Sequence, residues 1–549
     1  MKKLYLFLLT GSLFLNSCSN DEEITTPPGN ETFAPQLTAT VEENGITTKS
    51  GVIEDNDYTL GEKFYWTNGD ATTVFFRNSA MTNQTQYKKV EYSANVATGV
   101  KSNSCAFNII DAESIDNGEY TTYGFFPTPA WEMRRDYANF LTVNIPAYQT
   151  QTQANSEHLG AYMLMKATNN VTVNGSSPIN LSYKHLGSVI RFAVWNNSSN
   201  SNLKLANINV RLSSGKVVFA THAELDDIDA TSLSISDYSK VPELTLSLTG
   251  DARNFSTKNG KSQCEGYMAV LPTATDAFDS SDDLIIELSL TDGTNNYLVT
   301  KTYNVSTDLS FLQNGIEQGK SYYFQLKADN ADLTAITGTS YAVGDYWPDS
   351  TTPEGVVFWI KPGSLGTQGK VVGLNETYVS KWGPNKDEAA AGVVGIRSVK
   401  DGATATKSMI TKYKSNGTFD TDYPAFHYIY NTVNSGHENG VWYLPARDEL
   451  KMLYAGYSGK VYESIVYWTT NEMPDYNSSE CIAAHSAFNT KLTAKGGDAF
   501  GSGSNSVNWW YLSSSEYGTA TSYSLTLEKG SYNYDDKSYD GNIRWIRKF

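Results

Sequence analysis

The sequence predicts a mainly β protein whose C-terminal third is α+β, and three observations lead to this prediction. Aromatic residues make up 13% of the 549 residues, and such side chains suit pleated, half-buried surfaces better than helices. Apolar and polar residues alternate over most of 32–329, as they do in strands with one buried face. Eight of the eleven Trp residues lie between 347 and 545, so this later stretch is predicted to have an aromatic core of its own.

Regular alternation marks individual strands in 32–329. Leu alternates with Thr and Ser over 244–249, and apolar residues alternate again over 286–290, before Asp292-Gly293. This dipeptide predicts a tight turn, so we expect the second run to form a hairpin with the strand that follows. A denser apolar run over 189–195 predicts a strand covered on both faces. The region is therefore expected to form a β-sandwich, or two in tandem.

Helical spacing is confined to the last third of the chain. The first predicted helix has an apolar face made of Phe426, Ile429, Tyr430 and Val433. The second follows Pro445, a residue type favoured in a first helical turn, and its apolar face is made of Leu450, Leu453, Tyr454 and Tyr457. Because the chain becomes small and polar around 331–339, we expect a domain boundary there.

The first residues predict an export signal with a lipid anchor. Lys2 and Lys3 precede an apolar stretch, 4–15, that is too short to span a bilayer, and Leu15-Asn-Ser-Cys18 follows. The tetrapeptide resembles the bacterial lipobox, which implies that 1–17 is removed and that the thiol of Cys18 is lipidated. Two or three acyl chains would anchor the protein stably, since each buried CH₂ contributes about 0.8 kcal/mol.

Residues 18–31 are predicted to form a tether. Ser19-Asn-Asp-Glu-Glu23 resembles the acidic signal that sends lipoproteins of the Bacteroides group to the outer face of the outer membrane. Pro27, Pro28 and Gly29 favour an extended linker that lifts the folded part off the membrane. We therefore expect a lipid-anchored protein exposed on the surface of the cell outer membrane.

Charge and cysteine usage restrict the chemistry. The net charge of −17, with no run of Lys or Arg, disfavours nucleic acid as a partner. After Cys18, an odd set remains, Cys105, Cys264 and Cys481, which cannot form a complete disulfide framework. Cys105 and Cys264 could be bonded to each other, or both could be buried thiols. No C-x-x-C or H-x-x-x-H spacing predicts a metal site, and no cofactor is expected.

Several short segments occur in a recognisable order between 37 and 326. They are Leu37-Thr-Ala-Thr-Val41, Trp66-Thr-Asn-Gly-Asp70, Tyr120-Thr-Thr-Tyr-Gly-Phe-Phe-Pro127, Val143-Asn-Ile-Pro146 with Gln149, Leu181-Ser-Tyr-Lys-His185, Tyr267-Met-Ala-Val-Leu-Pro272 and Gly319-Lys-Ser-Tyr-Tyr-Phe-Gln-Leu326. In this order they resemble the fimbrillin family of Bacteroides-type pilus subunits and related surface adhesins. That family folds as two tandem transthyretin-like β-sandwiches, so the resemblance implies sandwiches at 32–170 and 171–329.

A second resemblance covers 338–549. It is carried by Val343-Gly-Asp-Tyr-Trp-Pro-Asp349, Gly355-Val-Val-Phe-Trp359, Trp442-Tyr-Leu-Pro-Ala-Arg-Asp-Glu-Leu450, Tyr511-Leu-Ser-Ser-Ser-Glu516 and Ile543-Arg-Trp-Ile-Arg-Lys-Phe549. These segments resemble the DUF1566 or Fibrobacter-paralogue type of domain, which is related to the C-type-lectin-like fold. The resemblance implies a lectin-like α+β domain at the C-terminal side of the sandwiches.

No motif in the chain predicts catalysis. His185 precedes an apolar strand without any Ser or Cys nucleophile constellation, so we expect a hydrogen-bonded structural histidine. Paired carboxylates of the glycosidase type are also absent from the sequence pattern, and the chain is not expected to be an enzyme. The oxygen-rich cluster Asp535, Asp536, Asp540 and Asn542 is explained by turn chemistry more simply than by calcium.

Three residues of the lectin-like domain are candidates for ligand binding: Trp509, Trp510 and Glu516. Adjacent strand residues point to opposite faces, so one Trp is expected to face outward beside Ser and Asn donors, as stacking on a sugar ring requires. Glu516 ends a Ser-rich strand, where bonding to backbone donors competes with ligand binding and is favoured. The same structural role is favoured for 447–449 in the first turn of the second predicted helix.

The resemblances together imply a pilus tip or accessory adhesin of a fimbrium. Subunits of such pili are joined by donating a strand to a neighbour's groove, so other pilus subunits are expected partners. A glycan or protein ligand is expected at the C-terminal domain. Family members are matured after an Arg or Lys, and because Arg77 lies inside a predicted strand, Lys49 is the candidate cleavage site. The alternative is a solitary surface glycan-binding lipoprotein of a nutrient-uptake system.

Overall fold

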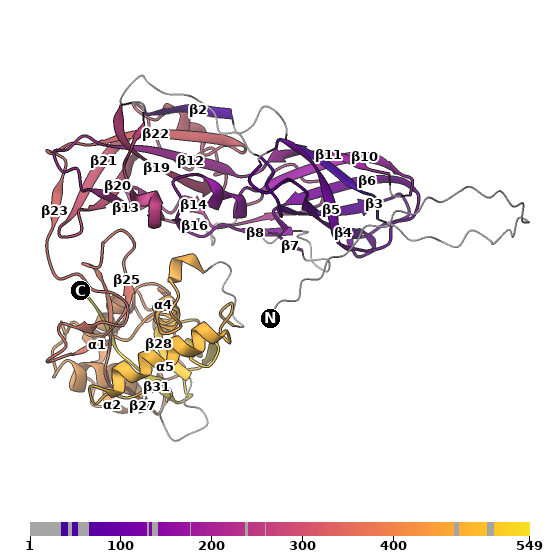
Figure 1. Ribbon diagram of the computed structural model, residues 1–549. Helices are drawn as coiled ribbons and strands as arrows, with labels where there is room; N and C mark the ends of the chain where they lie inside the picture. Colours follow the sequence, from indigo (N-terminus) through magenta and orange to yellow (C-terminus); the bar gives the residue numbers. More distant parts are fainter. Residues whose placement is uncertain are drawn as a thin grey trace, which may run out of the picture.

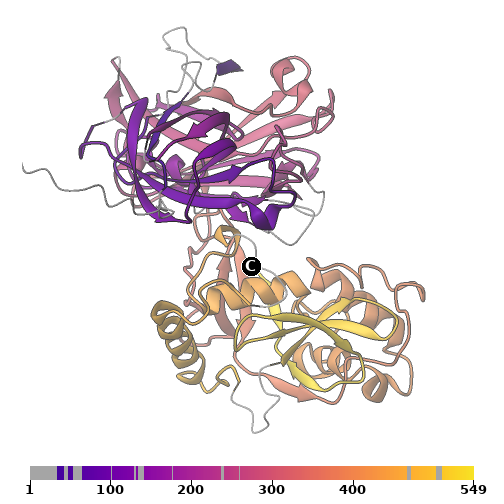
Figure 2. The same cartoon turned by 90° about the vertical axis from the view of Figure 1, so that its right-hand side faces the viewer.

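The computed structural model describes residues 34–41, 47–52, 65–100, 102–128, 131–133, 141–175, 177–235, 240–258, 260–465, 472–501 and 510–549. Strands make up 40% and helices 16% of the structure, so the prediction of a mainly β chain is confirmed. Two β units lie side by side, and the C-terminal α+β unit lies next to the second of them (Figures 1 and 2).

The first unit is a closed barrel. Its strands, in order around the ring, are β1 (Leu37–Val41), β11 (Ile179–His185), β10 (Met165–Val173), β6 (Gly118–Phe126), β3 (Ala71–Arg77), β4 (Lys88–Ala94) and β5 (Ser104–Ala112). β1 closes the ring because it pairs in parallel with β11 and antiparallel with β5. Inside the barrel, the buried ring of Trp66 meets Phe107 and Phe126 edge-on at centroid distances of 5.1 Å.

This architecture differs from the predicted sandwich and from the predicted boundary at residue 170. Residue 170 lies inside β10, and the barrel is completed only by β11. Two strands from the N-terminal side of that boundary, β2 (Thr47–Val52) and β9 (Tyr148–Gln151), belong to sheets of the second unit. The sequence pattern identifies buried faces, but it carries no information about which strands become neighbours.

The second unit is a sandwich of two sheets around an apolar core. The five-stranded sheet has the order β18 (Ser256–Lys258), β19 (Lys261–Val270), β12 (Ser188–Asn196), β22 (Lys320–Ala328), β2. The six-stranded sheet has the order β23 (Thr334–Ile336), β21 (Asn296–Asn304), β20 (Asp283–Thr291), β13 (Lys204–Leu212), β17 (Glu243–Leu248), β9. The predicted hairpin is confirmed as β20 and β21, and the alternating apolar residues of β17 and β20 are buried.

Two glutamine side chains close the edge of β19, where β18 no longer covers it. Gln149 of β9 accepts a hydrogen bond from the Ala269 N–H (2.9 Å) and donates one to the Ala269 carbonyl (2.7 Å). Gln151 accepts from the Tyr267 N–H (3.0 Å) and donates to the Glu265 carbonyl (2.9 Å). Each side-chain amide therefore takes the place of the backbone hydrogen-bond partner that a neighbouring strand would supply to β19. Because β9 belongs to the six-stranded sheet, these bonds also connect the two sheets.

The two β units also contain short elements. They are the sheet of β15 (His222–Leu225), β8 (Leu141–Asn144) and β7 (Trp131–Met133), the pair β14 (Phe219–Ala220) and β16 (Lys240–Val241), and the 3₁₀ turns η1 (Gln84–Gln86), η3 (Glu157–Ala161), η5 (Gly250–Arg253) and η6 (Ser310–Asn314). β8 and β15 place residues from both sides of the expected boundary in one sheet.

The C-terminal unit contains two small sheets and several helices. The sheets are β24 (Tyr346–Trp347), β25 (Gly355–Ile360), β26 (Gly369–Gly373), β32 (Ile546–Lys548), and β27 (Thr377–Val379), β31 (Gly541–Ile543), β28 (Trp510–Glu516), β29 (Thr521–Thr526), β30 (Tyr532–Asp536). The helices are α1 (Gly402–Tyr413), α2 (Phe419–Asp422), α3 (Pro424–Tyr428), the π-helix η7 (Ile429–Val433), α4 (Arg447–Tyr457), η8 (Tyr462–Ser464) and α5 (Ser479–Thr493). A hydrogen bond from the Ser289 hydroxyl to the Gly363 carbonyl (2.6 Å) links this unit to the sandwich.

Both helices predicted from the sequence are present. α4 buries Leu450, Leu453, Tyr454 and Tyr457, as its spacing predicts. The other prediction corresponds to α3 followed by the π-helix, whose wider turn interrupts the 3.6-residue period. α1 and α5 were not expected from the sequence.

Cys105, Cys264 and Cys481 are free thiols, so the possible Cys105–Cys264 disulfide is not formed. Cys264 lies in the sandwich core, where burial raises the pKa of its thiol to about 12. Among the residues described, no helix is both long and apolar enough to cross a membrane.

We expect Gln149→Leu and Gln151→Leu each to lower the free energy of unfolding by about 1 to 3 kcal/mol, because each change leaves buried backbone groups of β19 without partners. Urea denaturation followed by circular dichroism measures the effect. Gln153→Leu is the matched control, since this exposed side chain lies two residues further along. Equal stability of all three variants would contradict the proposed edge closure.

Candidate functional site

The predicted ligand-binding residues do not form one surface. Cys18 and Trp509 lie outside the described residues, while Trp510 begins β28 and is half-buried. Glu516 ends the same strand and is only 1% exposed. Because Glu516 is buried, its surroundings decide whether it is a ligand-binding or a structural residue.

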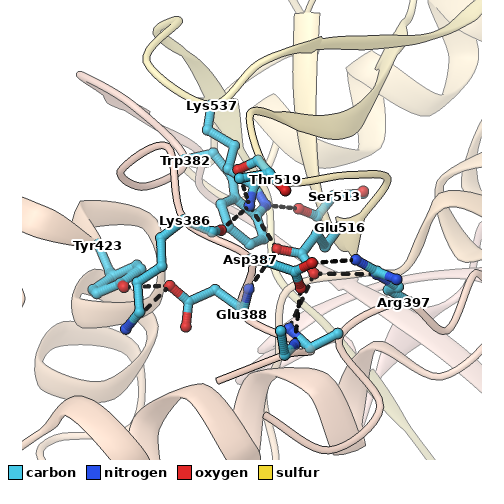
Figure 3. A network of polar contacts seen from close by, with 12 residues as sticks. Trp382, Lys386, Asp387, Glu388, Arg397, Tyr423, Ser513, Glu516, Thr519 and Lys537 are labelled. Atoms are coloured by element: carbon cyan, nitrogen blue, oxygen red, sulfur yellow. Dashed lines mark hydrogen bonds and ion pairs between the residues drawn. The ribbon is translucent and has the colours of Figure 1, made fainter. Parts of the chain in front are cut away.

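The Glu516 carboxylate is the centre of a buried polar network (Figure 3). One oxygen, Oε1, accepts hydrogen bonds from the Glu388 N–H (2.8 Å) and from Lys537 Nζ (2.6 Å). The other, Oε2, accepts from the Ala389 N–H (3.1 Å), and Arg397 Nε lies 3.4 Å away. Its four contacts to chain groups leave the carboxylate no accessible position for a ligand, so the structure favours the structural role of Glu516.

Lys537 is the cationic partner of Glu516 and is fully buried. Besides the carboxylate, its ammonium donates to the carbonyls of Lys386 (2.6 Å) and Thr519 (3.0 Å), which uses the three N–H groups of a lysine. The ammonium also lies 4.9 Å from the centre of the Trp382 ring. A charge that is satisfied in this way holds three loops of the domain together.

A second buried carboxylate extends the same network. Glu388 accepts hydrogen bonds from the hydroxyls of Tyr413 and Tyr423, each at 2.5 Å, and these two rings are stacked with centroids 4.4 Å apart. Burial, together with the carboxylate, raises the pKa of Tyr423. Lys386 donates to the Tyr413 hydroxyl at 2.6 Å and lies 3.8 Å from Glu388.

The first turn of α4 is also structural. The Glu449 carboxylate accepts from Lys370 Nζ (2.8 Å) and from the Tyr443 hydroxyl (2.9 Å). It also accepts from the backbone N–H groups of Gly402 (3.0 Å) and Ala446 (2.9 Å), the second of which caps the helix. Asp448 pairs with Arg447, whose guanidinium lies over two tyrosine rings. These residues therefore fix the start of α4 rather than face a ligand.

The other residues singled out by the sequence have structural surroundings as well. Asp535 accepts from the Ser524 hydroxyl, Asp536 accepts from the Ser538 N–H, and Asp540 accepts from the Tyr378 hydroxyl. Among the residues described, no group of three or more His, Cys, Asp or Glu side chains is arranged to hold a metal ion. His185 ends β11, and burial lowers its pKa to about 4.

A cavity of about 400 Å³ lies elsewhere in the C-terminal unit, and sequence reasoning did not identify it. It is bounded by α1, by the loop 434–443 and by Lys548 of β32. Its lining includes Lys407, Ile410, Asn439 and Trp442. The segment from Trp442 to Leu450 forms a recognisable motif in the sequence. Residue spacing alone does not predict that α1 and Lys548 lie next to it in space.

Lys49 lies in β2, at one edge of the five-stranded sheet. β2 pairs in parallel with β22, and Lys49 is in register with Tyr322 (Figure 1). Among the described strands, β2 has no other partner. The candidate cleavage site therefore lies within a strand that is held by a single neighbour.

Comparisons with known proteins gave the following. No family model and no curated protein matches the sequence. The solved structures that it resembles include a candidate cell adhesion protein from Bacteroides uniformis (14% identity, 55% of this chain, 94% of that chain, TM-score 0.33) and a fimbrial protein from Bacteroides ovatus (14%, 92%, 99%, 0.26). A further one is the fimbrial anchor protein Mfa2 from Porphyromonas gingivalis (10%, 55%, 95%, 0.23). TM-scores of this size carry no argument about function, which is argued below from the chain itself.

Lys537→Met should lower the free energy of unfolding of the C-terminal unit by about 3 to 5 kcal/mol, because it leaves the buried Glu516 carboxylate without its cation. Urea denaturation followed by tryptophan fluorescence measures this, since Trp382 packs against Lys537. The control is Lys386→Met, because the Lys386 side chain is 46% exposed and its removal should cost about 0 to 1 kcal/mol. Similar effects of the two changes would contradict the role of the buried pair.

Stability should fall as the pH is lowered from about 6.5 towards 4, because unfolded His185 takes up a proton in this window while folded His185 does not. Above pH 6.5 the contribution is fully present. The slope expected from this one residue is up to about 1.4 kcal/mol per pH unit. Urea denaturation at a series of pH values, compared with a His185→Asn variant, measures it. Parallel pH profiles of the two proteins would contradict the expectation.

Proposed function

We propose that this chain is a cell-surface adhesin of a pilus, which a lipid on Cys18 anchors in the outer membrane until cleavage after Lys49 releases the mature chain. Its tandem β units form the assembly part, in which strands pass between subunits. Its C-terminal unit contacts a glycan or protein ligand as the tip or an accessory part of the fimbrium. The observation that carries the proposal is the position of β2 in the five-stranded sheet.

β2 is suited to being exchanged. It is an edge strand, it comes from the N-terminal side of the barrel, and its ladder with β22 contains an irregularity between Lys49 and Val52. Loss of β2 would expose the backbone N–H and C=O groups along one side of β22. An exposed edge of this kind is a template for an extended strand from another molecule.

The core beneath β22 would keep its shape during such an exchange. Tyr322, Phe324 and Leu326 are each at most 1% exposed and belong to the sandwich core. β22 also retains its parallel pairing with β12, from Val189 to Asn196. The incoming strand would therefore find an ordered edge instead of a collapsed groove.

The proposal predicts that cleavage after Lys49 accompanies assembly. We expect Lys49→Gln, expressed from the full chain in its host, to abolish a mature form that begins at Ser50 and to deplete the chain from purified pili. N-terminal sequencing and immunoblotting of the pilus fraction measure both effects. Lys258→Gln is the control, since Lys258 lies in β18 at the opposite edge of the same sheet.

Two results would overturn the pilus assignment. One is recovery of Lys49→Gln in pili at the level of the unchanged protein. The other is a chain that is present on the cell surface but absent from pilus fractions, which would instead favour a solitary lipoprotein.

A further inference from the structure

One wall of the cavity beside α1 is the loop 434–443, and the backbone of this part of the chain has an irregular conformation. The wall follows the π-helix η7, a rare conformation that is frequent at functional sites. Ser435 lies two residues after its last residue, Val433, and has a φ of 50°, which is uncommon for a residue other than glycine. The backbone therefore adopts an unfavourable conformation where it forms the cavity.

Asn434 fixes this wall. Its side chain donates to the Trp442 carbonyl (2.8 Å) and accepts from the Trp442 N–H (3.3 Å), which closes the loop 434–442. Gly440 packs against Asn434 so closely that a Cβ there would lie 2.0 Å from Asn434 Cγ. Only glycine fits at this position, so the wall is formed before any ligand arrives.

The cavity has a positive surplus although the whole chain is acidic. Lys407, Lys548 and one carboxylate, Glu438, line it, and both lysine side chains are exposed. The charge of Lys407 helps to lower the pKa of Glu438, and that of Lys548 helps to lower the pKa of Asp401. The carboxylates nearby are already bonded: Glu438 to Lys414 and Thr411, and Asp401 to the Thr404 N–H and hydroxyl. The lining thus carries two ammonium groups against one carboxylate.

The remaining lining is partly apolar. Ile410 and the 9% exposed Trp442 give it an apolar wall, and the exposed Val441 adds apolar surface at its rim. Asn439 supplies an exposed amide. The volume of about 400 Å³ falls within the range of about 300 to 1,000 Å³ typical of small-ligand sites. The lining therefore fits a compact ligand with one apolar face, several hydroxyls and a negative charge.

We propose that this cavity binds a sugar acid, a pyranose that carries a carboxylate, with Lys407 and Lys548 receiving the carboxylate. The wall of Ile410 and Trp442 receives the C–H face of the ring, and Asn439 bonds its hydroxyls. The inference rests on the proposed role of the C-terminal unit as the ligand-binding part, and it defines the class of ligand. It is independent of strand exchange at β2.

Isothermal titration of the purified full chain with N-acetylneuraminate and with glucuronate tests the proposal, with glucose and N-acetylglucosamine as neutral counterparts. We expect the acids to bind and the neutral sugars to bind at least about tenfold more weakly, with affinity falling as ionic strength rises. Lys407→Gln and Lys548→Gln should each weaken binding about fivefold or more. Lys400→Gln, an exposed lysine outside the cavity, is the matched control and should have no effect.

Equal binding of neutral and acidic sugars, or equal loss in Lys400→Gln, would overturn the proposal. A short acidic peptide that binds as well as the sugar acids would overturn the sugar class. An adhesion assay with cells that display the chain distinguishes failure of the cavity assignment from failure of the adhesin proposal. If the Lys407→Gln, Lys548→Gln double variant adheres to glycan-coated surfaces like the unchanged protein, the cavity assignment fails and the adhesin proposal stands. If the unchanged protein neither adheres nor enters pili, the proposed function itself fails.

Discussion

The architecture of the two β units depends on how the edges of their sheets are satisfied. A buried or long exposed edge leaves backbone donors and acceptors without partners, and each unmade bond is costly. The barrel has no edge because β1 pairs on both of its sides. In the sandwich, the free side of β19 is closed by the amides of Gln149 and Gln151, and the free side of β22 is closed by β2. The two glutamine amides are buried in the core, whereas β2 is attached by one parallel ladder.

The C-terminal unit solves the same problem by other means. Its sheets are short and much of its backbone is irregular, so buried side-chain charges take over the role that ladders have in the sandwich. The pair Glu516–Lys537 joins the end of β28 to a turn, and the pair Glu449–Lys370 joins α4 to β26. The buried Arg544 donates to the carbonyls of Gly373, Leu374 and Asp498. Because each charge is surrounded by chain donors or acceptors, these pairs stabilise one loop arrangement instead of offering free groups to a ligand.

The sequence predicts those features that follow from a short-range period. The strands at 244–248 and 286–290 and helix α4 were predicted because a period of two or 3.6 identifies their buried faces. The sequence predicted a boundary at residue 170 and a sandwich as the first unit, whereas the structure has a strand at 170 and a barrel. Neither difference could be foreseen, because strand neighbours depend on long-range register. Trp510 and Glu516 were plausible ligand residues by type, but Lys537, which buries the charge of Glu516, lies 21 residues away in a turn that no pattern marks. The cavity was missed for the same reason, since its walls come from α1, the loop after the π-helix and β32.

The two proposed roles of the chain, pilus assembly and ligand recognition, rest on two different departures from regular structure. In the tandem β units the least secured element is an edge strand, and a sheet edge recognises any extended backbone, since its hydrogen bonds do not depend on side chains. In the C-terminal unit the buried carboxylates of Glu449 and Glu516 are bonded to chain donors, and the cavity is lined by Lys407 and Lys548 against the single carboxylate of Glu438. A cavity with an excess of positive charge and a preformed wall can discriminate between ligands. A ligand that cannot neutralise the charge of such a rigid cavity binds it more weakly. In the proposed function, strand pairing and selective ligand binding therefore belong to separate units of one chain.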